Sequence, residues 1–218
     1  IFLVVFFAVF ARGLPDTSGL YQVDRQPSIT YLDRNGALIA TRGTQMAPPA
    51  DLEALPDYVP AAFIAIEDRR FYHHPGFDPI GMMRAAVTNM RAGRVVQGGS
   101  TLTQQLAKNL FLTPDQTLHR KAQELMLAVW LEMKFTKAEI LALYLNRVYF
   151  GAGAYGIEAA SQRYFDKSAS ELTVGEAALL AGLLKAPSRY SPLSESERAA
   201  ARATVVLNEM EEAGVITP

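Results

Sequence analysis

The chain has 218 residues, which is enough for one sizeable globular domain with a buried core. Its formal net charge of −1 gives no general attraction to nucleic acid or to anionic lipid, so we expect no nucleic-acid partner. The absence of cysteine excludes disulfides, thiol nucleophiles and cysteine-ligated metals. It fits either an oxidising or a reducing compartment.

The chain begins with an uncharged apolar run that ends at Arg12. This run is shorter than the ~20 residues that a helix needs to cross a bilayer, but the sequence starts with Ile rather than Met. We interpret residues 1–12 as the end of a transmembrane anchor. A signal-peptide core and a buried helix are the alternatives, but the run has neither a small-x-small cleavage pattern nor a polar stripe.

Residues 13–60 are predicted to form a tether. Glycine and proline recur between residues 13 and 19, which favours a flexible segment. Farther on, Asn35-Gly36 stands between two short segments of β-forming residues, 29–32 and 37–40, and predicts a β-hairpin. Prolines then interrupt the chain repeatedly until helical periodicity begins at Ala61.

Residues 61–218 read as one mainly helical domain. Pro114 with Asp115 interrupts the helical pattern, a glycine-rich turn follows at residues 151–156, and Pro187 ends another helix. Residues 196–215 read as a final amphipathic helix. The sequence shows no internal repeat and no low-complexity tract.

The first segment that could carry chemistry runs from Ile66 to Asp78. It places acids, arginines, histidines and aromatic residues directly after the apolar run 61–66. A helix that ends in charged residues before a Pro-Gly turn is common, so composition alone assigns no function. Glu67 and Asp68 lie beside an apolar segment, however, and such a position can raise a carboxyl pKa toward the range that a general base needs.

The second segment, residues 98–109, opens with two glycines and leads into a predicted helix. One polar face of that helix carries Thr101, Gln105, Lys108 and Asn109, while leucines recur on another face. One interpretation is an ordinary solvated surface. Hydroxyl and amide side chains with one lysine near a helix start also suit the binding of sugars and phosphate, so both interpretations stay open.

The third segment places Arg120 and Glu124 four residues apart on a largely apolar helix. The spacing favours an ion pair, although a glutamate on so apolar a helix could instead face a cleft. The histidines at 73, 74 and 119 lack the spacing of an H-E-x-x-H metal site. No serine begins an S-x-x-K motif, which argues against a penicillin-sensitive transpeptidase site in these residues.

Taken in order, these segments resemble the signature motifs of the family 51 glycosyltransferases. This domain occurs in class A penicillin-binding proteins and in monofunctional peptidoglycan glycosyltransferases. The resemblance extends over residues 60–195, because two further blocks, 140–157 and 176–187, also fit the family pattern. The segment 31–40 is more similar to the lead-in of the bifunctional members, so we expect the chain to be the transferase part of a longer protein.

The resemblance implies roles for individual residues. Glu67 matches the general base, which takes the proton from the sugar 4-hydroxyl of lipid II so that this oxygen attacks C1 of the growing chain. The reaction inverts the anomeric carbon and releases undecaprenyl diphosphate. Glu124 matches the second essential glutamate, and Lys108 and Arg120 match diphosphate contacts. Further positions are expected to bind substrate or to shape the cleft: Asp68, Arg70, Phe71, His74, Thr101, Gln105 and Asn109.

The family also implies a setting for the domain. Its fold is mainly α, lysozyme-like and two-lobed, and it works on the outer, periplasmic side of the bacterial cytoplasmic membrane. Its partners are lipid II, the growing glycan strand, the lipid bilayer and other cell-wall synthesis or division proteins. A divalent cation, Mg²⁺ or Mn²⁺, would help to neutralise the leaving diphosphate, with Glu67 or Glu124 as its ligand.

Several apolar residues near the motifs are candidates for a membrane-contacting surface. These are Phe63, Ile64, Met82, Met83, Leu110, Phe111 and Leu112. Helical spacing alone would make most of them core residues.

A lysozyme-like hydrolase and a non-catalytic cell-wall scaffold are the alternative functions. A hydrolase also uses two carboxylates but has no diphosphate to bind, whereas Lys108 and Arg120 stand inside the motifs. A scaffold would tolerate the loss of Glu67 or Glu124, and the chain has both. The predicted function is therefore the polymerisation of lipid II into β-1,4 glycan strands.

Overall fold

The computed structural model describes residues 29–36, 38–42, 45–94, 98–111 and 117–217. They belong to two compact units. Unit 1 comprises residues 67–144, and unit 2 comprises residues 29–66 and 145–217. The predicted anchor and the first part of the tether lie outside the described residues. Within the described part of the chain, no helix is both long and apolar enough to cross a membrane.

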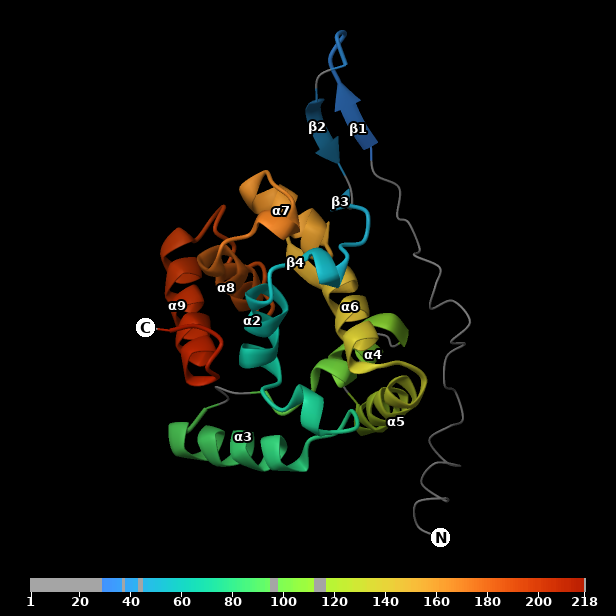
Figure 1. The fold of residues 1–218 in the computed structure, drawn as a ribbon, viewed down its shortest axis with the longest axis vertical. Helices are drawn as coiled ribbons and strands as arrows, with labels where there is room; N and C mark the ends of the chain where they lie inside the picture. The colour runs from blue at the N-terminus through green and yellow to red at the C-terminus, as the bar shows by residue number, and fades with distance from the viewer. Residues whose placement is uncertain (1–28, 37, 43–44, 95–97, 112–116, 218) are drawn as a thin grey trace. The chain divides into compact units, whose positions relative to one another are not determined.

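Unit 2 begins with the predicted β-hairpin. Strand β1 (Ile29–Leu32) pairs antiparallel with β2 (Leu38–Arg42), as Figure 1 shows. Between them Gly36 has a φ of 84° and donates its N–H to the carbonyl of Asp33 at 3.1 Å. Glycine adopts such a conformation without steric cost, so the hairpin predicted from the Asn-Gly pair is confirmed.

A second sheet in unit 2 was not predicted. Strands β3 (Gln45–Met46), β5 (Ala154–Tyr155) and β4 (Tyr149–Gly151) form it in that order, with β3 parallel to β5. The prediction that residues 61–218 are helical apart from turns is therefore wrong at β4 and β5. Strands of two or three residues carry no periodic signal, and β5 is completed by a partner from the tether.

Within unit 2, Asn146 at the end of α6 (Lys137–Arg147) binds the backbone of the tether. Asn146 accepts from the backbone N–H of Ala50 at 2.7 Å and donates to the carbonyl of the same residue at 2.9 Å. Gly156, with a φ of 84°, passes so close that an added Cβ would lie 2.7 Å from the Asn146 carbonyl oxygen. Only glycine fits at this position without backbone movement.

The α-helices of unit 2 are α2 (Tyr58–Glu67), α7 (Ile157–Phe165), α8 (Val174–Leu183) and α9 (Ser196–Glu212). Helix α2 starts three residues before the predicted Ala61, because a proline such as Pro60 is tolerated in the first turn of a helix. Phe63 is fully buried and packs edge to face on Phe150, with the two ring centres 5.9 Å apart. Its assignment to a membrane-contacting surface is therefore wrong.

Short 3₁₀ helices complete unit 2: η2 (Leu52–Ala54) and η4 (Ala169–Glu171). Helices α8 and α9 pack against each other. At their contact, a Cβ on Gly182 would come within 3.0 Å of the Arg202 side chain. The predicted final helix is thus confirmed, and it ends three residues earlier than expected.

Unit 1 starts at Glu67, the last residue of α2, and ends at Tyr144 within α6 (Lys137–Arg147). It also contains η3 (Phe71–His73), α3 (Pro79–Ala92), α4 (Leu102–Phe111) and α5 (Leu118–Lys134). Helices α4 and α5 pack against each other (Figure 1). Fully buried residues of unit 1 include Leu102 and Leu106 on α4, Leu131 on α5 and Ile140 on α6.

Candidate functional site

Every residue that the sequence assigned to the site lies in unit 1. Three pieces of chain supply them: the end of α2 with the segment that follows it, α4 with the Thr101 that precedes it, and the first turns of α5. The candidate site can therefore be described within one compact unit. Phe71 is fully buried, so its side chain belongs to the core beneath the segment that follows α2.

Glu67 ends α2 and is half-buried. Its Oε2 accepts a hydrogen bond from Nε2 of Gln105 on α4 at 2.9 Å. The carbonyl oxygen of the same amide accepts from the hydroxyl of Tyr144 on α6 at 3.1 Å. Burial raises the pKa of Tyr144 well above its usual value of 10.0, and the nearby carboxylates of Glu67 and Asp68 raise it further. Tyr144 is therefore a neutral hydroxyl at any physiological pH.

Asp68 joins the first segment to α4. Both of its carboxylate oxygens accept from Nε2 of His74, at 2.9 and 3.0 Å. One of them also accepts from the backbone N–H of Leu102, the first residue of α4, at 3.0 Å. Asp68 and His74 are both buried, where hydrogen bonds are costly to lose.

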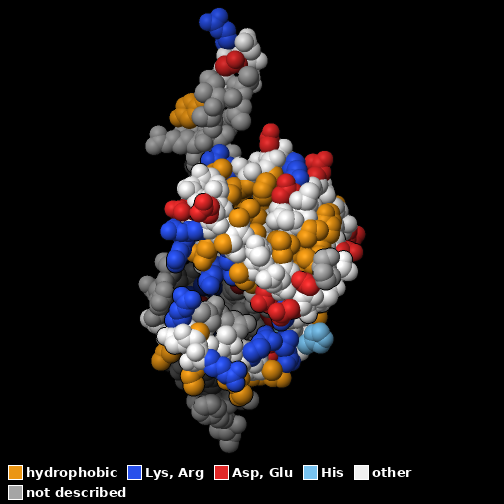
Figure 2. Space-filling model, turned by 90° about the vertical axis from the view of Figure 1, so that its left-hand side faces the viewer, with side chains coloured by type: hydrophobic (Ala, Val, Ile, Leu, Met, Phe, Trp, Pro, Cys, Tyr) orange, Lys and Arg blue, Asp and Glu red, His pale blue; other side chains and the backbone are white. Residues whose placement is uncertain are grey.

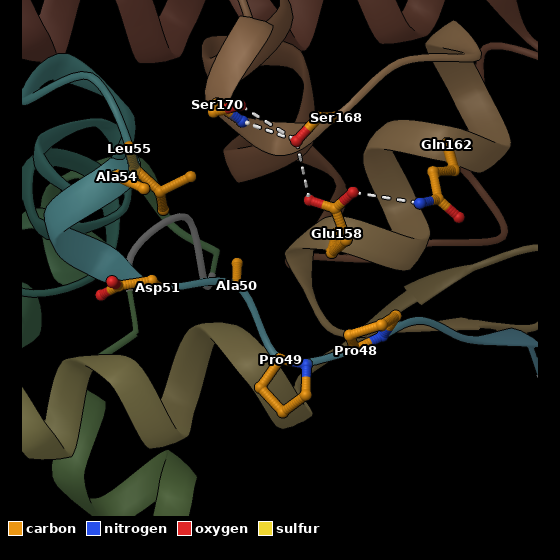
Figure 3. Close-up of a pocket in the computed structure, with 10 residues that line it drawn as sticks. All are labelled: Pro48, Pro49, Ala50, Asp51, Ala54, Leu55, Glu158, Gln162, Ser168 and Ser170. Atoms are coloured by element: carbon orange, nitrogen blue, oxygen red, sulfur yellow. Dashed lines mark hydrogen bonds between the residues drawn. The ribbon is translucent and has the colours of Figure 1, made fainter.

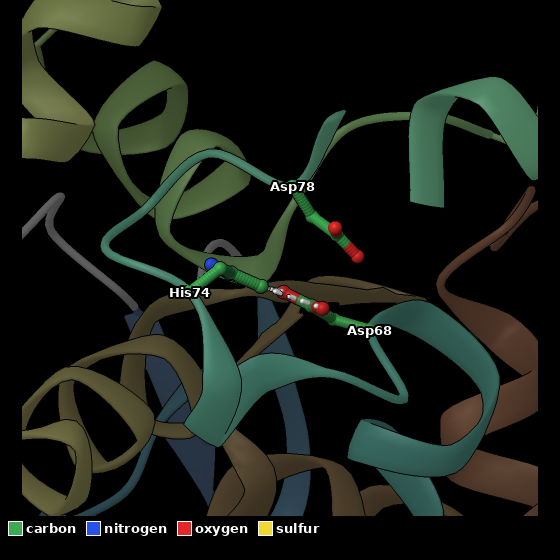
Figure 4. A group of neighbouring side chains, drawn as sticks. All are labelled: Asp68, His74 and Asp78. Atoms are coloured by element: carbon green, nitrogen blue, oxygen red, sulfur yellow. Dashed lines mark hydrogen bonds and ion pairs between the residues drawn. The ribbon is translucent and has the colours of Figure 1, made fainter. Parts of the chain in front are cut away.

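Asp78 lies beside this pair, as Figure 4 shows. One ligand atom from each of Asp68, His74 and Asp78 falls within 4.8 Å of the others, and the three side chains are buried. Arg70 forms an ion pair with Asp78 at 3.5 Å. In the structure, then, His74 and Arg70 supply positive or hydrogen-bonding partners to the two aspartates.

Thr101 caps α4 and holds the first segment to it. Its hydroxyl donates to the carbonyl of Gly76 at 2.8 Å and accepts from the N–H of Gln104 at 3.1 Å. Gln104 reaches back to the N–H of Thr101 at 3.3 Å, which completes a capping box. Gly76 has a φ of 80°, and an added Cβ would lie 3.0 Å from the carbonyl of Ala128.

Glu124 is almost fully buried on α5 and lies between two cations. Arg120 ion-pairs with one carboxylate oxygen, and Lys121 ion-pairs with the other at 2.7 Å. The Arg120 pair matches the predicted four-residue spacing. Sequence reasoning missed Lys121, although its three-residue spacing to Glu124 is an equally good signal. Lys121 also donates to the hydroxyl of Ser100 at 2.8 Å.

Lys108 and Asn109 are exposed on α4. Thr101 and Gln105, the other members of the predicted polar face, are buried and half-buried. The face therefore divides, with its first half engaged in bonds inside unit 1 and its second half open to solvent. An exposed lysine ammonium is available to a phosphate group.

Lys137 is a second residue that sequence reasoning missed. Its Nζ donates to Oε1 of Glu132 and to the backbone carbonyl of His74, both at 2.7 Å, and lies 4.4 Å from the centre of the Phe71 ring. Oε1 of Glu132 also accepts from Thr103 at 2.6 Å. Glu132 is only five positions from Lys137, but His74 is 63 positions away, and the sequence offers no local signal for that contact.

A pocket of about 250 Å³ lies in unit 2 and contains none of the predicted site residues. Glu158 stands in its wall (Figure 3), where it accepts from Gln162 at 3.0 Å and from the N–H of Ala169 at 2.9 Å. Ser168 also donates to it. These bonds hold α7 to η4, and we interpret this carboxylate as structural.

Comparison with known proteins decides the family. The model of the family described as "Transglycosylase" matches residues 35–211. The chain belongs to this family. The matched region of the transglycosylase chain is a peptidoglycan glycosyltransferase domain of the class A penicillin-binding protein type.

Curated relatives of the transglycosylase chain include two proteins named penicillin-binding protein 1A. The one from Aquifex aeolicus is 49% identical over 99% of this chain and 30% of its own length. The one from Escherichia coli is 48% identical over 94% of this chain and 24% of its own length. The chain thus spans less than a third of the length of these relatives.

A solved structure supports the same assignment. The chain is similar to the crystal structure of penicillin-binding protein 1A from Haemophilus influenzae. The match covers 89% of this chain and 20% of the chain in that structure. The TM-score is 0.52 at 27% sequence identity. The predicted family and the mainly helical fold are therefore confirmed.

Proposed function

We propose that the chain polymerises lipid II into β-1,4 glycan strands with Glu67 as the general base. The observation that carries the proposal is the half-buried Glu67 carboxylate, bonded to Gln105 in the same unit as Lys108, Arg120 and Lys121. A carboxylate can accept a proton from a sugar hydroxyl, and cations can stabilise a departing diphosphate. A hydrolase of neutral sugars would not need the cations.

In the proposed reaction, Glu67 takes the proton of the 4-hydroxyl of lipid II as that oxygen attacks C1 of the growing chain. The C1–O bond to diphosphate breaks, and its electron pair leaves with undecaprenyl diphosphate. Because the new bond forms opposite the old one, the α-linked donor gives a β-linked product. No glycosyl-enzyme intermediate is needed.

Positive charge must balance the leaving diphosphate. Lys108 is exposed, and Arg120 is held by the buried Glu124 at a fixed place on α5. We assign both to the diphosphate. Glu124 then acts by keeping Arg120 and Lys121 in place, which organises the substrate side of the site.

The dependence on Mg²⁺ or Mn²⁺ stays a prediction. Both oxygens of Glu124 already contact a cationic side chain, so a metal ion there would have to displace Arg120 or Lys121. As the side chains stand, Glu124 does not fit a metal ligand, and we assign no step to a metal. Dialysis against a chelator, followed by measurement of bound metal and of polymer, tests this prediction.

We also propose that α3 contacts the outer face of the cytoplasmic membrane. Ile80, Met83, Val87 and Met90 recur at helical spacing, and Met83 and Met90 are 71% and 80% exposed. Exposed apolar stripes of this kind mark interaction surfaces. Arg84 and Arg91 lie on the same helix. Figure 2 shows basic side chains gathered among hydrophobic ones in its lower part.

Flotation with phosphatidylglycerol-containing vesicles tests the membrane proposal. Replacing Met83 and Met90 together with glutamate should leave most of the protein unbound. The control replaces Ala201 and Val205 together with glutamate, which places the same two charges at exposed positions of α9 in unit 2. Equal vesicle binding by the two variants would refute the role of α3.

The lysozyme-like description of the fold and contacts with other cell-wall proteins stay predictions.

The function is tested with labelled lipid II in detergent, followed by separation of the products by size. Long strands that lysozyme degrades support the proposal. Shortening of added glycan would instead support a hydrolase, and no change would support a scaffold. Glu67→Gln keeps the shape of the side chain and removes the base, so it should abolish polymerisation without changing the melting temperature. Polymer from this variant would refute the assignment of the base.

A further inference from the structure

The side chain of Tyr144 is linked to the Glu67 carboxylate through one amide. The Tyr144 hydroxyl donates to Oε1 of Gln105, and Nε2 of Gln105 donates to Oε2 of Glu67, at 3.1 and 2.9 Å. The three residues come from α6, α4 and the end of α2. We propose that Tyr144 is a positioning residue that holds the base Glu67 in place through the Gln105 amide. This inference rests on the proposed function.

The link depends on the direction in which the amide faces. A glutamine amide can rotate by half a turn, which exchanges its carbonyl oxygen and its NH₂ group. In the rotated state the carbonyl oxygen would face the Glu67 carboxylate, and two acceptors would meet. The Tyr144 proton would at the same time lose its acceptor. A buried hydroxyl without a partner is unfavourable, so Tyr144 keeps the NH₂ group toward Glu67.

Tyr144 is well suited to this role because it cannot easily move or ionise. Its side chain is fully buried, and close packing holds an aromatic ring of this kind in one position. Burial, together with the charges of Glu67 and Asp68, raises its pKa well above 10.0. The hydroxyl therefore keeps its proton both before and after Glu67 takes one from the substrate.

Full burial also separates Tyr144 from the substrate, so its effect must pass through Gln105. Loss of the hydroxyl lets the amide rotate, and the Glu67 carboxylate then spends part of its time misplaced. We expect a decrease in kcat of about fivefold to tenfold, the scale that one hydrogen bond of ordinary net strength supplies. KM should stay within about twofold, because uniform substrate binding is not affected.

The experiment uses the full-length protein and labelled lipid II. It compares Tyr144→Phe, Gln105→Ala and the double variant. If Tyr144 acts through Gln105, the double variant has the kcat of Gln105→Ala alone. The matched control is Tyr164→Phe, which removes a tyrosine hydrogen bond to the carbonyl of Phe150 in unit 2 at 3.0 Å. This control should polymerise at the wild-type rate.

The outcomes separate the inference from the proposed function. Absence of polymer from the wild-type protein refutes the proposed function. Polymer from the wild type together with an unchanged kcat in Tyr144→Phe refutes only the role of Tyr144. So does a decrease that multiplies with that of Gln105→Ala, because it would show an effect that does not pass through the amide. Thermal unfolding of each variant identifies any loss that comes from the fold.

Discussion

The ammonium group of Lys137 lies 2.7 Å from the backbone carbonyl oxygen of His74. The same group ion-pairs with Glu132 at 2.7 Å and lies over the ring of Phe71. One lysine on α6 thus holds both the segment that follows Glu67 and a carboxylate of α5. The pair is mostly buried, which makes either partner costly to lose alone.

Replacing Lys137 with methionine should therefore destabilise unit 1. The Glu132 carboxylate would be left buried without its cation, and breaking a buried pair in this way costs about 3 kcal/mol. Urea unfolding should show this decrease in the free energy of unfolding. Lys134→Met, at an exposed lysine on α5, is the control and should change stability by less than about 0.5 kcal/mol. Similar stability of the two variants would contradict the role given to Lys137.

Arg120 and Lys121 both bind Glu124 but differ in exposure. The Arg120 side chain is 16% exposed and the Lys121 side chain is 46% exposed. Ion pairs at exposed positions contribute little, so Arg120→Met should reduce polymerisation and stability more than Lys121→Met. We expect the activity of Arg120→Met to fall at least about tenfold, the effect of losing a charged contact to a diphosphate. A larger loss in Lys121→Met would show that the diphosphate assignment belongs to the lysine.

Replacing Asp68 with alanine should remove one of the two described bonds that join the first segment to α4 and destabilise unit 1. The N–H of Leu102 and Nε2 of His74 would lose their acceptor, and each unsatisfied buried group costs about 1–3 kcal/mol. Chemical denaturation measures the loss. The control is Asp51→Ala, where an exposed aspartate accepts from the N–H of Glu53, and its loss should cost about 1 kcal/mol. If both variants lose the same stability, Asp68 does not have the role described.

Glu176 gives a pH-dependent contribution to the stability of unit 2. Burial acts to raise its pKa, but the bonds from Lys167 and Thr173 outweigh burial, and the net pKa lies below the usual 4.5. A carboxyl with a lowered folded-state pKa stabilises above its unfolded pKa and loses that contribution as the pH falls through the folded one. The difference in melting temperature between wild type and Glu176→Gln should therefore be largest near neutral pH and shrink below 4.5.

The size of this effect follows from the geometry. Glu176 closes a capping box with Thr173 at the start of α8 and ion-pairs with Lys167 at 2.6 Å. A cap of this kind contributes about 1 kcal/mol. Glu197→Gln, on the exposed first turn of α9, is the control. A pH-independent difference for Glu176→Gln would contradict the role of its charge.

The β-hairpin and most helices could be predicted from the sequence because their signals are local. The hairpin at Asn35-Gly36, the end of α2 at Glu67 and the start of α9 at Ser196 all appear where the pattern placed them. The start of α2 was misplaced because a proline was read as a helix stop rather than as a first-turn residue. Strands β4 and β5 were missed because they are short.

The sequence predicted which residues belong to the candidate site, but it did not predict most of the contacts between them. The Arg120–Glu124 pair follows from spacing along one helix. By contrast, Asp68 meets the N–H of Leu102 across 34 residues, and Lys137 meets His74 across 63. Such contacts depend on how helices pack, and no periodic pattern encodes them. For the same reason the sequence does not single out Lys137 and Tyr144, although each touches a predicted site residue. Lys121 differs, because its three-residue spacing to Glu124 is a local signal.

The two bonds that join the first segment to α4 also have a consequence for the chain between them. Thr101 to Gly76 and Leu102 to Asp68 close the ends of the stretch that contains α3. Substitutions within α3 should therefore leave the base and its partners in register. The exposed methionines of α3 can therefore be replaced without loss of the bonds that join the candidate site residues.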